Sequence, residues 1–588
     1  MYFVERHIRE LKQELWRDLP AACARYRALF LEDPAALAQA ALRAIDDRNH
    51  RAVIAIGRAL DDEGALMAFR PAPKLVFAGA VSVALLTERR WQEALDLLER
   101  PELTNTSHFK YWRQRALALA GLGRLAEAIV AIQHALIVRP DFAEGLSLHR
   151  LLKKAQRAEE GLQSQFTWPN IRWMTGLYLE LGLDGKATEL AGQWSAAPPP
   201  LGPGDDENVL CVLQAIVEVA EPGLITTAAA LLPGMGDDER LGTLLTRCQV
   251  RLGRAGEACS GDSAGRDLAL ERALACAAAG KLEFAIDRLS RLSEADRQDM
   301  EVRAALAYCV GQDVQRRAPM RLKAPDGRRR IFNLTPFNDE LAMLKLKLAE
   351  MGDWVDQFVI VESPVTFTGQ PKPLHFDRHK AEFAAYGDKL RHVIAPTPPS
   401  YIDTPWARDF FQRDMAISAI ADLCCAPDDL VLLTDADEIV DREAIATFDG
   451  EYAGLNMAMY RFFLNYRPSK TNGPRRRTGA VWKARHLHRF GSSYARFHLS
   501  RLRADGYLID RAGWHFTSVG ASSRIAAKMS NYAHQEHRAQ WGDTDRVEDR
   551  LARIRSGTME RGWERCEIDD SFPAYVREHA ADLADMLL

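Results

Sequence analysis

The sequence predicts two regions of different architecture: an all-α helical solenoid up to about residue 315, and an α/β domain with a mostly parallel sheet from about residue 330. Three observations lead to this prediction. The first region is rich in Ala and Leu with helical periodicity, the second alternates short β-branched apolar runs with helical stretches, and a basic segment broken by Pro and Gly separates them. We therefore divide the chain into residues 1–315, a linker at 316–329 and residues 330–588.

The composition is that of an ordinary globular protein, and it excludes several classes. Of the 588 residues, 47% are hydrophobic and 27% are charged, and the net charge is −4. Binding to nucleic acid normally requires a strong basic excess, so we expect no nucleic-acid partner. No run approaches the roughly 20 apolar residues that cross a bilayer, and the first residues lack the apolar stretch of a signal peptide. We therefore expect a cytoplasmic protein with no membrane span.

One clear unit predicts the architecture of the first region. From Phe109 to Pro140, large and small residues alternate as in two antiparallel helices, with Gly123 at the turn, and weaker copies lie at 89–101 and 280–292. The pattern resembles the tetratricopeptide repeat, whose period is about 34 residues. A solenoid of this kind predicts a surface that recruits a protein partner or the acceptor of a reaction. The alternative is a helical domain of plain amphipathic hairpins.

Strand-like and helix-like segments alternate in the second region. The apolar runs are 330–337, 356–363, 390–396 and 429–439, and the helical stretches are 339–352 and 408–425. This alternation predicts a largely parallel sheet covered by helices. Ligands of such sheets bind beyond the carboxyl ends of the strands, so the residues that follow the apolar runs are the first candidates for a functional site.

The strongest candidate follows the apolar run LVLL, where Asp435 and Asp437 stand one residue apart. Two carboxylates at the end of a buried strand suit a divalent cation, Mn²⁺ or Mg²⁺, which prefers oxygen ligands and bridges the diphosphate of a nucleotide. Such a cation neutralises the charge that develops on a departing nucleoside diphosphate. Capping of the helix-like segment that follows is the alternative role for either aspartate.

Five segments in order resemble glycosyltransferase family 17. They are 337–376, FFQRDMAI at 410–417, LLTDADEI at 432–439, GWHFTSVG at 513–520 and KMSNYAHQE at 528–536. The resemblance covers about residues 328–570. It implies a GT-A-like fold, a UDP-sugar donor and inversion at the anomeric carbon of the sugar, which is N-acetylglucosamine in the animal members. Those members carry a membrane anchor, so their N-glycan acceptor is not carried over, and we expect a glycan, polysaccharide or glycoprotein acceptor.

The matching segments supply the candidate site residues. For the donor they are Asn338, Glu362, Lys372, Arg413 and Trp514, and for the metal Asp435, Asp437 and His515. Inversion needs a general base that deprotonates the acceptor hydroxyl, and Asp510 and Glu536 are its candidates. Each residue has a structural alternative. Asn338 suits a helix cap, Glu362 suits a cap or an internal salt bridge, and His515 suits a core pair with Trp514.

Three functions compete. The leading hypothesis is a metal-dependent inverting glycosyltransferase whose helical region recruits the acceptor or a partner. The alternative from another class is a tetratricopeptide-type interaction scaffold with an inactive transferase-like domain. A sugar-phosphate nucleotidyltransferase is disfavoured, because the first strand is followed by LTPFNDEL rather than by a glycine-rich phosphate loop.

Overall fold

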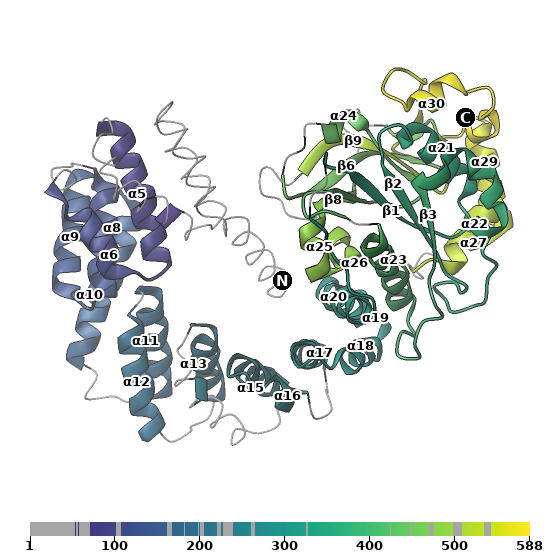
Figure 1. The fold of residues 1–588 in the computed structure, drawn as a ribbon. Coiled ribbons are helices and arrows are strands. Elements are labelled where there is room, and N and C mark those ends of the chain that lie inside the picture. The colour runs from purple at the N-terminus through teal and green to yellow at the C-terminus, as the bar shows by residue number, and fades with distance from the viewer. Residues whose placement is uncertain are drawn as a thin grey trace. The chain divides into compact units, whose positions relative to one another are not determined.

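The computed structural model describes most of the chain from residue 71 onward and, before that, only Val53, Ile54 and Gly57 (Figure 1). The described ranges are 71–101, 108–161, 167–181, 183–197, 199, 205–219, 225–226, 239–259, 265–324, 327–423, 425–446, 448, 450–469, 476–497, 508–533 and 542–588. The chain divides into two compact units, one spanning Glu5–Ala275 and the other containing Cys276–Leu588. Among these residues, no helix has both the length and the apolar character that crossing a bilayer requires.

The described part of the first unit is helical, as predicted. Its helices are α5 (Pro71–Thr87), α6 (Trp91–Leu98), α8 (Phe109–Gly121), α9 (Leu125–Val138), α10 (Ala143–Gly161), α11 (Trp168–Leu181), α12 (Asp184–Ala196), α13 (Asp205–Val219), α15 (Glu239–Arg251) and α16 (Ala255–Ala258). The predicted hairpin is α8 and α9, which pack together. Ala116 and Ala128 are fully buried in it, because only small side chains let two helices approach so closely. Gly123 forms the turn with a φ of 77°, a conformation that favours glycine.

Three helices of the second unit precede its sheet. After α17 (Arg266–Ala278) come α18 (Leu282–Ser290), α19 (Glu294–Arg297) and α20 (Met300–Arg317). Helix α20 packs on α23 (Pro405–Asp422) and α26 (Ser492–Phe497). A Cβ on Gly311 would lie 3.2 Å from the Cα of Gly491, so these backbones are in close contact. The sequence placed α20 with the helical region and the joint at 316–329. In the structure, packing on the sheet-containing unit begins before that joint.

The sheet of this unit has eight described strands in the order β3-β2-β1-β4-β8-β6-β9-β5. They are β1 (Ile331–Phe337), β2 (Gln357–Glu362), β3 (Leu390–Ile394), β4 (Leu430–Leu433), β5 (Glu438–Val440), β6 (Tyr452–Arg461), β8 (Arg476–Lys483) and β9 (Leu508–Thr517). The neighbours β3, β2, β1 and β4 are parallel, as are β6 and β9, whereas β4–β8, β8–β6 and β9–β5 are antiparallel. The predicted parallel strands thus form one half of the sheet.

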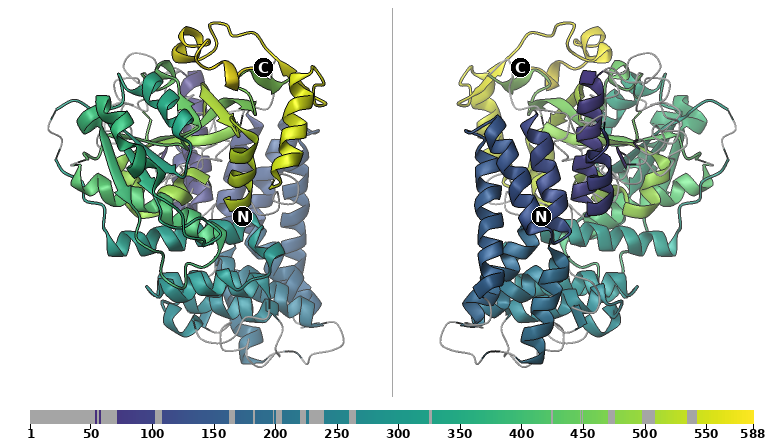
Figure 2. Two further views of the ribbon diagram at one scale, coloured as in Figure 1. Left: turned by 90° about the vertical axis from the view of Figure 1, so that its right-hand side faces the viewer. Right: turned by 90° about the vertical axis from the view of Figure 1, so that its left-hand side faces the viewer.

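Helices cover the sheet and carry side chains to its edge. Helix α21 (Leu341–Met351) shares one core with residues of β2 and β4, and α23 lies beside β1 and β2. Helices α27 (Ser522–Asn531) and α29 (Thr544–Arg555) lie side by side (Figure 2). The remaining elements are α22 (His375–His379), α24 (Arg442–Ala446), α25 (Ala484–Phe490), α30 (Ala574–Glu578), two 3₁₀ segments (Lys380–Lys389 and Ala584–Met586) and the paired strands β7 (Tyr466–Pro468) and β10 (Trp563–Arg565).

Candidate active site

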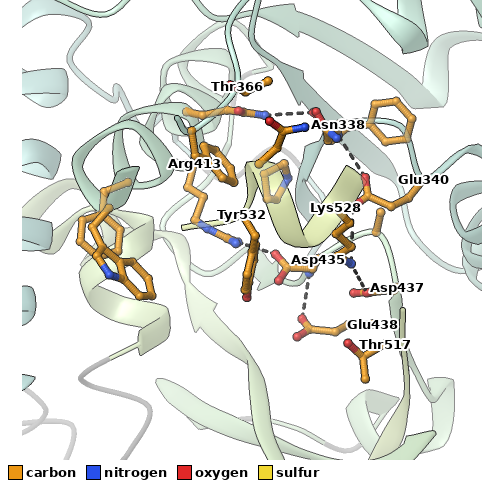
Figure 3. A pocket seen from close by; sticks show the side chains of 18 of the residues that line it. Asn338, Glu340, Thr366, Arg413, Asp435, Asp437, Glu438, Thr517, Lys528 and Tyr532 are labelled. Atoms are coloured by element: carbon orange, nitrogen blue, oxygen red, sulfur yellow. Dashed lines mark hydrogen bonds and ion pairs between the residues drawn. The ribbon is translucent and has the colours of Figure 1, made fainter. Parts of the chain in front are cut away.

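A cavity of about 430 Å³ lies at the carboxyl ends of β1 and β4, the sheet edge where the sequence predicts a ligand (Figure 3). Its walls come from the end of β1, the loop after β2, the loop between β4 and β5, β9, and helices α20, α23, α26 and α27. Of the predicted site residues, Asn338, Lys372, Arg413, Asp435, Asp437 and His515 line it. Residues far apart in the sequence therefore meet in one cavity.

The acidic pair reaches the cavity because β4 ends beneath it. Leu430–Leu433 are all buried and fix the start of the loop. The backbone N–H of Asp435 donates to Oε2 of Glu438 at 2.8 Å, and the N–H of Glu438 donates to the carbonyl of Asp435 at 3.0 Å. The carboxylate of Glu438 is thus used within the turn, and this closed turn presents Asp435 and Asp437 to the cavity.

Asp435 is held by two arginines. Arg496 donates from Nη1 to Oδ1 at 2.8 Å and from Nη2 to Oδ2 at 2.9 Å, and Arg413 also binds Oδ1. Burial alone raises the pKa of a carboxyl, but the charges of Arg413 and Arg496 outweigh it and hold the pKa of Asp435 far below its usual range. Both oxygens of this carboxylate are therefore occupied by guanidinium groups.

Asp437 has different partners. Lys528 of α27 donates to its Oδ2 at 2.8 Å and lies 3.6 Å from Oε1 of Glu340, while Nε2 of His515 lies 3.7 Å from its Oδ1. Burial opposes ionisation, but Lys528 and His515 overcome it and lower the pKa of Asp437. Within the described part of the chain, Oδ1 of Asp437 and Nδ1 of His515 have no hydrogen-bond partner.

The donor set partly fits the expected divalent cation. Two ligands that each lie about 2.1 Å from one cation are at most roughly 4.2 Å apart, so Asp437 Oδ1 and His515 Nε2 at 3.7 Å can share an ion. Asp435 does not join them in this arrangement, because both of its oxygens bind guanidinium groups. No group of three or more His, Cys, Asp or Glu side chains suited to a metal occurs among the described residues. Among the described residues, Asp437 and His515 are therefore the pair placed to share a cation.

The buried side chain of Lys347 holds the loop that carries Asp435 and Asp437. Nζ of Lys347 donates to the hydroxyls of Thr335 at 2.9 Å and Thr434 at 2.7 Å, and to the carbonyl of Asp435 at 2.8 Å. Its side chain is fully buried. Burial lowers the pKa of Lys347 to about 7, although Glu438 and Asp435 act in the opposite direction. Lys347 thus ties β1, β4 and the acidic loop together.

The loop after β2 supplies Lys372 rather than Glu362. The carboxylate of Glu362 is completely buried and accepts hydrogen bonds from the backbone N–H groups of Phe376 at 3.0 Å and Asp377 at 3.4 Å. Glu362 therefore has its structural alternative, a cap for backbone N–H groups of α22, and it does not line the cavity. Nζ of Lys372 lies 3.8 Å from Glu362, and within the described residues it makes no hydrogen bond. Burial lowers the pKa of Lys372, and its ammonium is placed to meet an anion.

Besides Glu362, two described residues predicted for the site, Trp514 and Asp510, do not line this cavity. Successive side chains of a strand point to opposite faces, so His515 faces the cavity whereas Trp514 lines a second one of about 780 Å³ and donates to the carbonyl of Ser571 at 2.7 Å. Asp510 is exposed and accepts a hydrogen bond from Asn456 at 2.6 Å, away from the cavity. Glu536 lies outside the described residues.

Sequence reasoning missed several residues of the cavity. Lys528 and Tyr532 stand in KMSNYAHQE, a segment that resembles the family, but neither is among the predicted site residues. Arg496 and Arg303 stand in segments without a recognisable motif. For the first two the resemblance was an available signal, and for the two arginines only the tertiary structure provides one.

Comparison with known proteins confirms the resemblance. The model of glycosyltransferase family 17 matches residues 318–556. The β-1,4-mannosyl-glycoprotein 4-β-N-acetylglucosaminyltransferases of Rattus norvegicus and Homo sapiens are each 32% identical over 124 residues, which is 20% of this chain and 23% of theirs. The chain thus spans under a quarter of the length of these relatives. A solved structure of Naa15/Naa10 bound to HypK-THB matches 48% of this chain and 47% of that chain at 17% identity with a TM-score of 0.19.

Proposed function

We propose that this chain, whose residues 318–556 match glycosyltransferase family 17, is an inverting glycosyltransferase that moves N-acetylglucosamine from UDP-N-acetylglucosamine to a hydroxyl of a glycan, polysaccharide or glycoprotein acceptor. The observation that carries the proposal is the pair Asp437 and His515 at the strand end, inside a cavity that also contains cationic side chains. A nucleotide sugar needs both features. Its diphosphate needs positive charge, and its leaving group needs charge neutralisation during transfer.

We assign the metal, Mn²⁺ or Mg²⁺, to Asp437 and His515. When bound, the cation neutralises the negative charge of the leaving UDP. Asp435 in this proposal keeps Arg413 and Arg496 in place, as its hydrogen bonds to both arginines indicate. The GT-A-like assignment follows from the family resemblance and from the acidic loop at the end of β4.

We assign the diphosphate to the cationic side chains of the cavity that make no hydrogen bond to Asp435. Lys372 has an ammonium without a hydrogen bond among the described residues, and it lines the cavity. Lys528 binds Asp437 and can turn toward a phosphate oxygen, since its carbon stem is flexible. Asn338 lines the same wall and offers an amide to the nucleoside. Each of these groups binds or orients the donor.

The acceptor hydroxyl must lose its proton as it attacks. Of the two bases predicted from the sequence, Asp510 lies outside the cavity beside Asn456. We therefore assign the base to Glu536, which follows α27, the helix that brings Lys528 to the cavity.

The helical region is assigned the recruitment of the acceptor or of a protein partner, in keeping with its predicted solenoid. The cytoplasmic location remains a prediction from the sequence. The rival scaffold hypothesis requires the cavity to bind no donor, although the paired carboxylates and the cations around them are all present.

The test is incubation of the full chain with a panel of UDP- and GDP-sugars, with Mn²⁺, with Mg²⁺ or with EDTA, while released nucleotide is measured. We expect UDP release from UDP-N-acetylglucosamine that depends on the cation. The matched control is Asp437→Asn, which keeps the size of the side chain and removes its charge. Nucleotide release by the wild type that equals this control for every donor would overturn the proposal in favour of the scaffold.

A further inference from the structure

One wall of the cavity comes from outside the segment that matches the transferase family. The match begins at residue 318, whereas Arg303 stands in the first turn of α20 and lines the cavity. Its guanidinium carbon lies 5.0 Å from the ring centroid of Trp406 on α23. The family match therefore does not account for this part of the site.

Aromatic rings form the cavity beside Arg303. Trp406 and Phe410 have ring centroids 5.6 Å apart, and Phe410 lies 6.0 Å from Phe497 of α26. All three rings line the cavity. Aromatic rings beside the guanidinium of Arg303 suit a sugar ring. The C–H face of a sugar packs on an aromatic ring, and its hydroxyls accept hydrogen bonds from a guanidinium.

A chain of contacts leads from these aromatic rings to Asp437 and His515, the pair to which we assign the metal. The guanidinium of Arg413 lies 5.1 Å from the centroid of Phe497 and also binds Asp435. Asp437 follows in the loop and pairs with Lys528, which also approaches Glu340. Along the cavity the aromatic rings therefore come first, then Arg413 with Asp435, and then Asp437 with His515. A donor whose diphosphate lies at the metal pair leaves the aromatic end for the second substrate.

Helix α20 is held against α25 and α26 by contacts that follow Arg303. Nε2 of Gln312 donates to the carbonyl of Arg489 at 2.6 Å, and Tyr308 meets Tyr494 edge to face with centroids 5.6 Å apart. The close approach of Gly311 to Gly491 adds a backbone contact. These contacts fix the backbone of α20, and the guanidinium of Arg303 is positioned by its contact with the ring of Trp406.

We infer that Arg303 and Trp406 form the subsite for the acceptor sugar ring, so that a helix preceding the family segment selects the acceptor. The inference rests on the proposed function. Arg303 is a specificity residue in this proposal: it binds the acceptor and takes no part in binding the donor.

The test measures binding of three small probes to the full chain in the presence of UDP and Mn²⁺: methyl β-mannoside, methyl β-glucoside and methyl β-glucuronide. Ligand-observed NMR gives the dissociation constant of each probe, and a separate titration gives that of UDP. We expect the wild type to bind at least one probe, and Arg303→Ala to weaken this binding about tenfold because a charge-assisted hydrogen bond is lost. The UDP affinity is expected to stay unchanged. Preference for the glucuronide identifies an acidic acceptor, and preference for a neutral glycoside identifies a neutral one.

Two variants control the result. Arg303→Lys keeps the charge but removes the planar group, so it is also expected to weaken binding of the probe. Arg291→Ala removes an arginine of the same unit whose side chain is 78% exposed, and is expected to change nothing. The inference is overturned if the wild type binds no probe, or if Arg303→Ala and Arg303→Lys, with melting temperatures like that of Arg291→Ala, bind the probe as well as that control. Failure of the proposed function gives a different result, namely no nucleotide release by the wild type.

Discussion

The guanidinium of Arg496 binds both carboxylate oxygens of Asp435, at 2.8 and 2.9 Å, while Asp437 two residues later pairs with Lys528 at 2.8 Å. The two aspartates are equivalent in the sequence motif, and their surroundings make them different. Asp435, whose side chain is 24% exposed, compensates two buried arginines, and Asp437 keeps one oxygen directed toward His515.

Substitution of the two aspartates is expected to separate stability from activity. Asp437→Asn should lower sugar transfer by roughly 100-fold or more, since the proposed metal ligand is lost, and should lower the melting temperature less than Asp435→Asn does, because Lys528 keeps Glu340 at 3.6 Å. Asp435→Asn should lower the free energy of unfolding by about 2 kcal/mol, because the buried Arg413 and Arg496 each lose a charge-assisted hydrogen bond, although they keep Asp409 and Glu438 as partners. Thermal and chemical denaturation of both variants, alongside transfer assays, checks this. An Asp435→Asn protein as stable as the wild type would contradict the structural role.

The sequence was sufficient to locate the cavity but not to assign the contacts of the side chains that line it. A buried apolar strand followed by Asp435 and Asp437 predicts a sheet-edge site from local pattern alone, and the cavity is there. The partners of these aspartates are 61 and 91 positions away, at Arg496 and Lys528. No local periodicity encodes such pairs, because they depend on how α26 and α27 pack on the sheet.

The placement of Trp514 illustrates a different limit. Its neighbour His515 reaches the cavity, and strand alternation sends Trp514 to the other face. A strand at GWHF would place Trp514 and His515 on opposite faces, whereas the sequence analysis assigns one to the donor and the other to the metal of the same site. By contrast, the predicted parallel half of the sheet needed only the alternation of apolar runs and helices.

His515→Ala tests the assignment of the metal. Nε2 of His515 faces Asp437 rather than a core partner, so the variant should need a higher Mn²⁺ concentration for half-maximal nucleotide release while its melting temperature changes little. A titration with Mn²⁺ and a melting curve on the same preparation decide the matter. A protein with a clearly lower melting temperature and an unchanged Mn²⁺ requirement would show that the imidazole only packs.

Removing α20 is expected to unfold the unit that contains the sheet. Val302, Leu306, Val310 and Val314 of this helix are at most 2% exposed, and each buried aliphatic side chain contributes about 2 kcal/mol. A fragment of residues 279–588 should therefore be soluble with a cooperative melt, whereas residues 325–588 should aggregate or melt without cooperativity. Expression of both fragments with size-exclusion chromatography and calorimetry checks this. A soluble, cooperatively melting fragment 325–588 would instead place the folding boundary at the predicted linker.

Asp414 is expected to make stability depend on pH. Its Oδ1 accepts hydrogen bonds from the hydroxyl of Ser492 at 2.9 Å and the N–H of Ser493 at 3.2 Å, while Oδ2 is buried and has no partner among the described residues. Burial raises the pKa of Asp414 to about 6 from its ordinary 3.8, although the two serines act against this rise. The folded protein thus favours the protonated carboxyl, and this stabilisation, complete below about pH 4, is lost as the pH rises through 6.

Asp414→Asn imitates the protonated carboxyl at every pH and should remove this dependence. The free energy of unfolding of the variant minus that of the wild type should rise between about pH 4 and pH 6, by up to about 3 kcal/mol for a shift of roughly two pKa units. Chemical denaturation at several pH values measures the difference. The side chain of Asp570 is fully exposed, so Asp570→Asn serves as the control. Its difference in the free energy of unfolding from the wild type should not change with pH. A flat or falling difference for Asp414→Asn would mean that the carboxyl is ionised in the folded protein throughout this range, with Ser492 and Ser493 satisfying its charge.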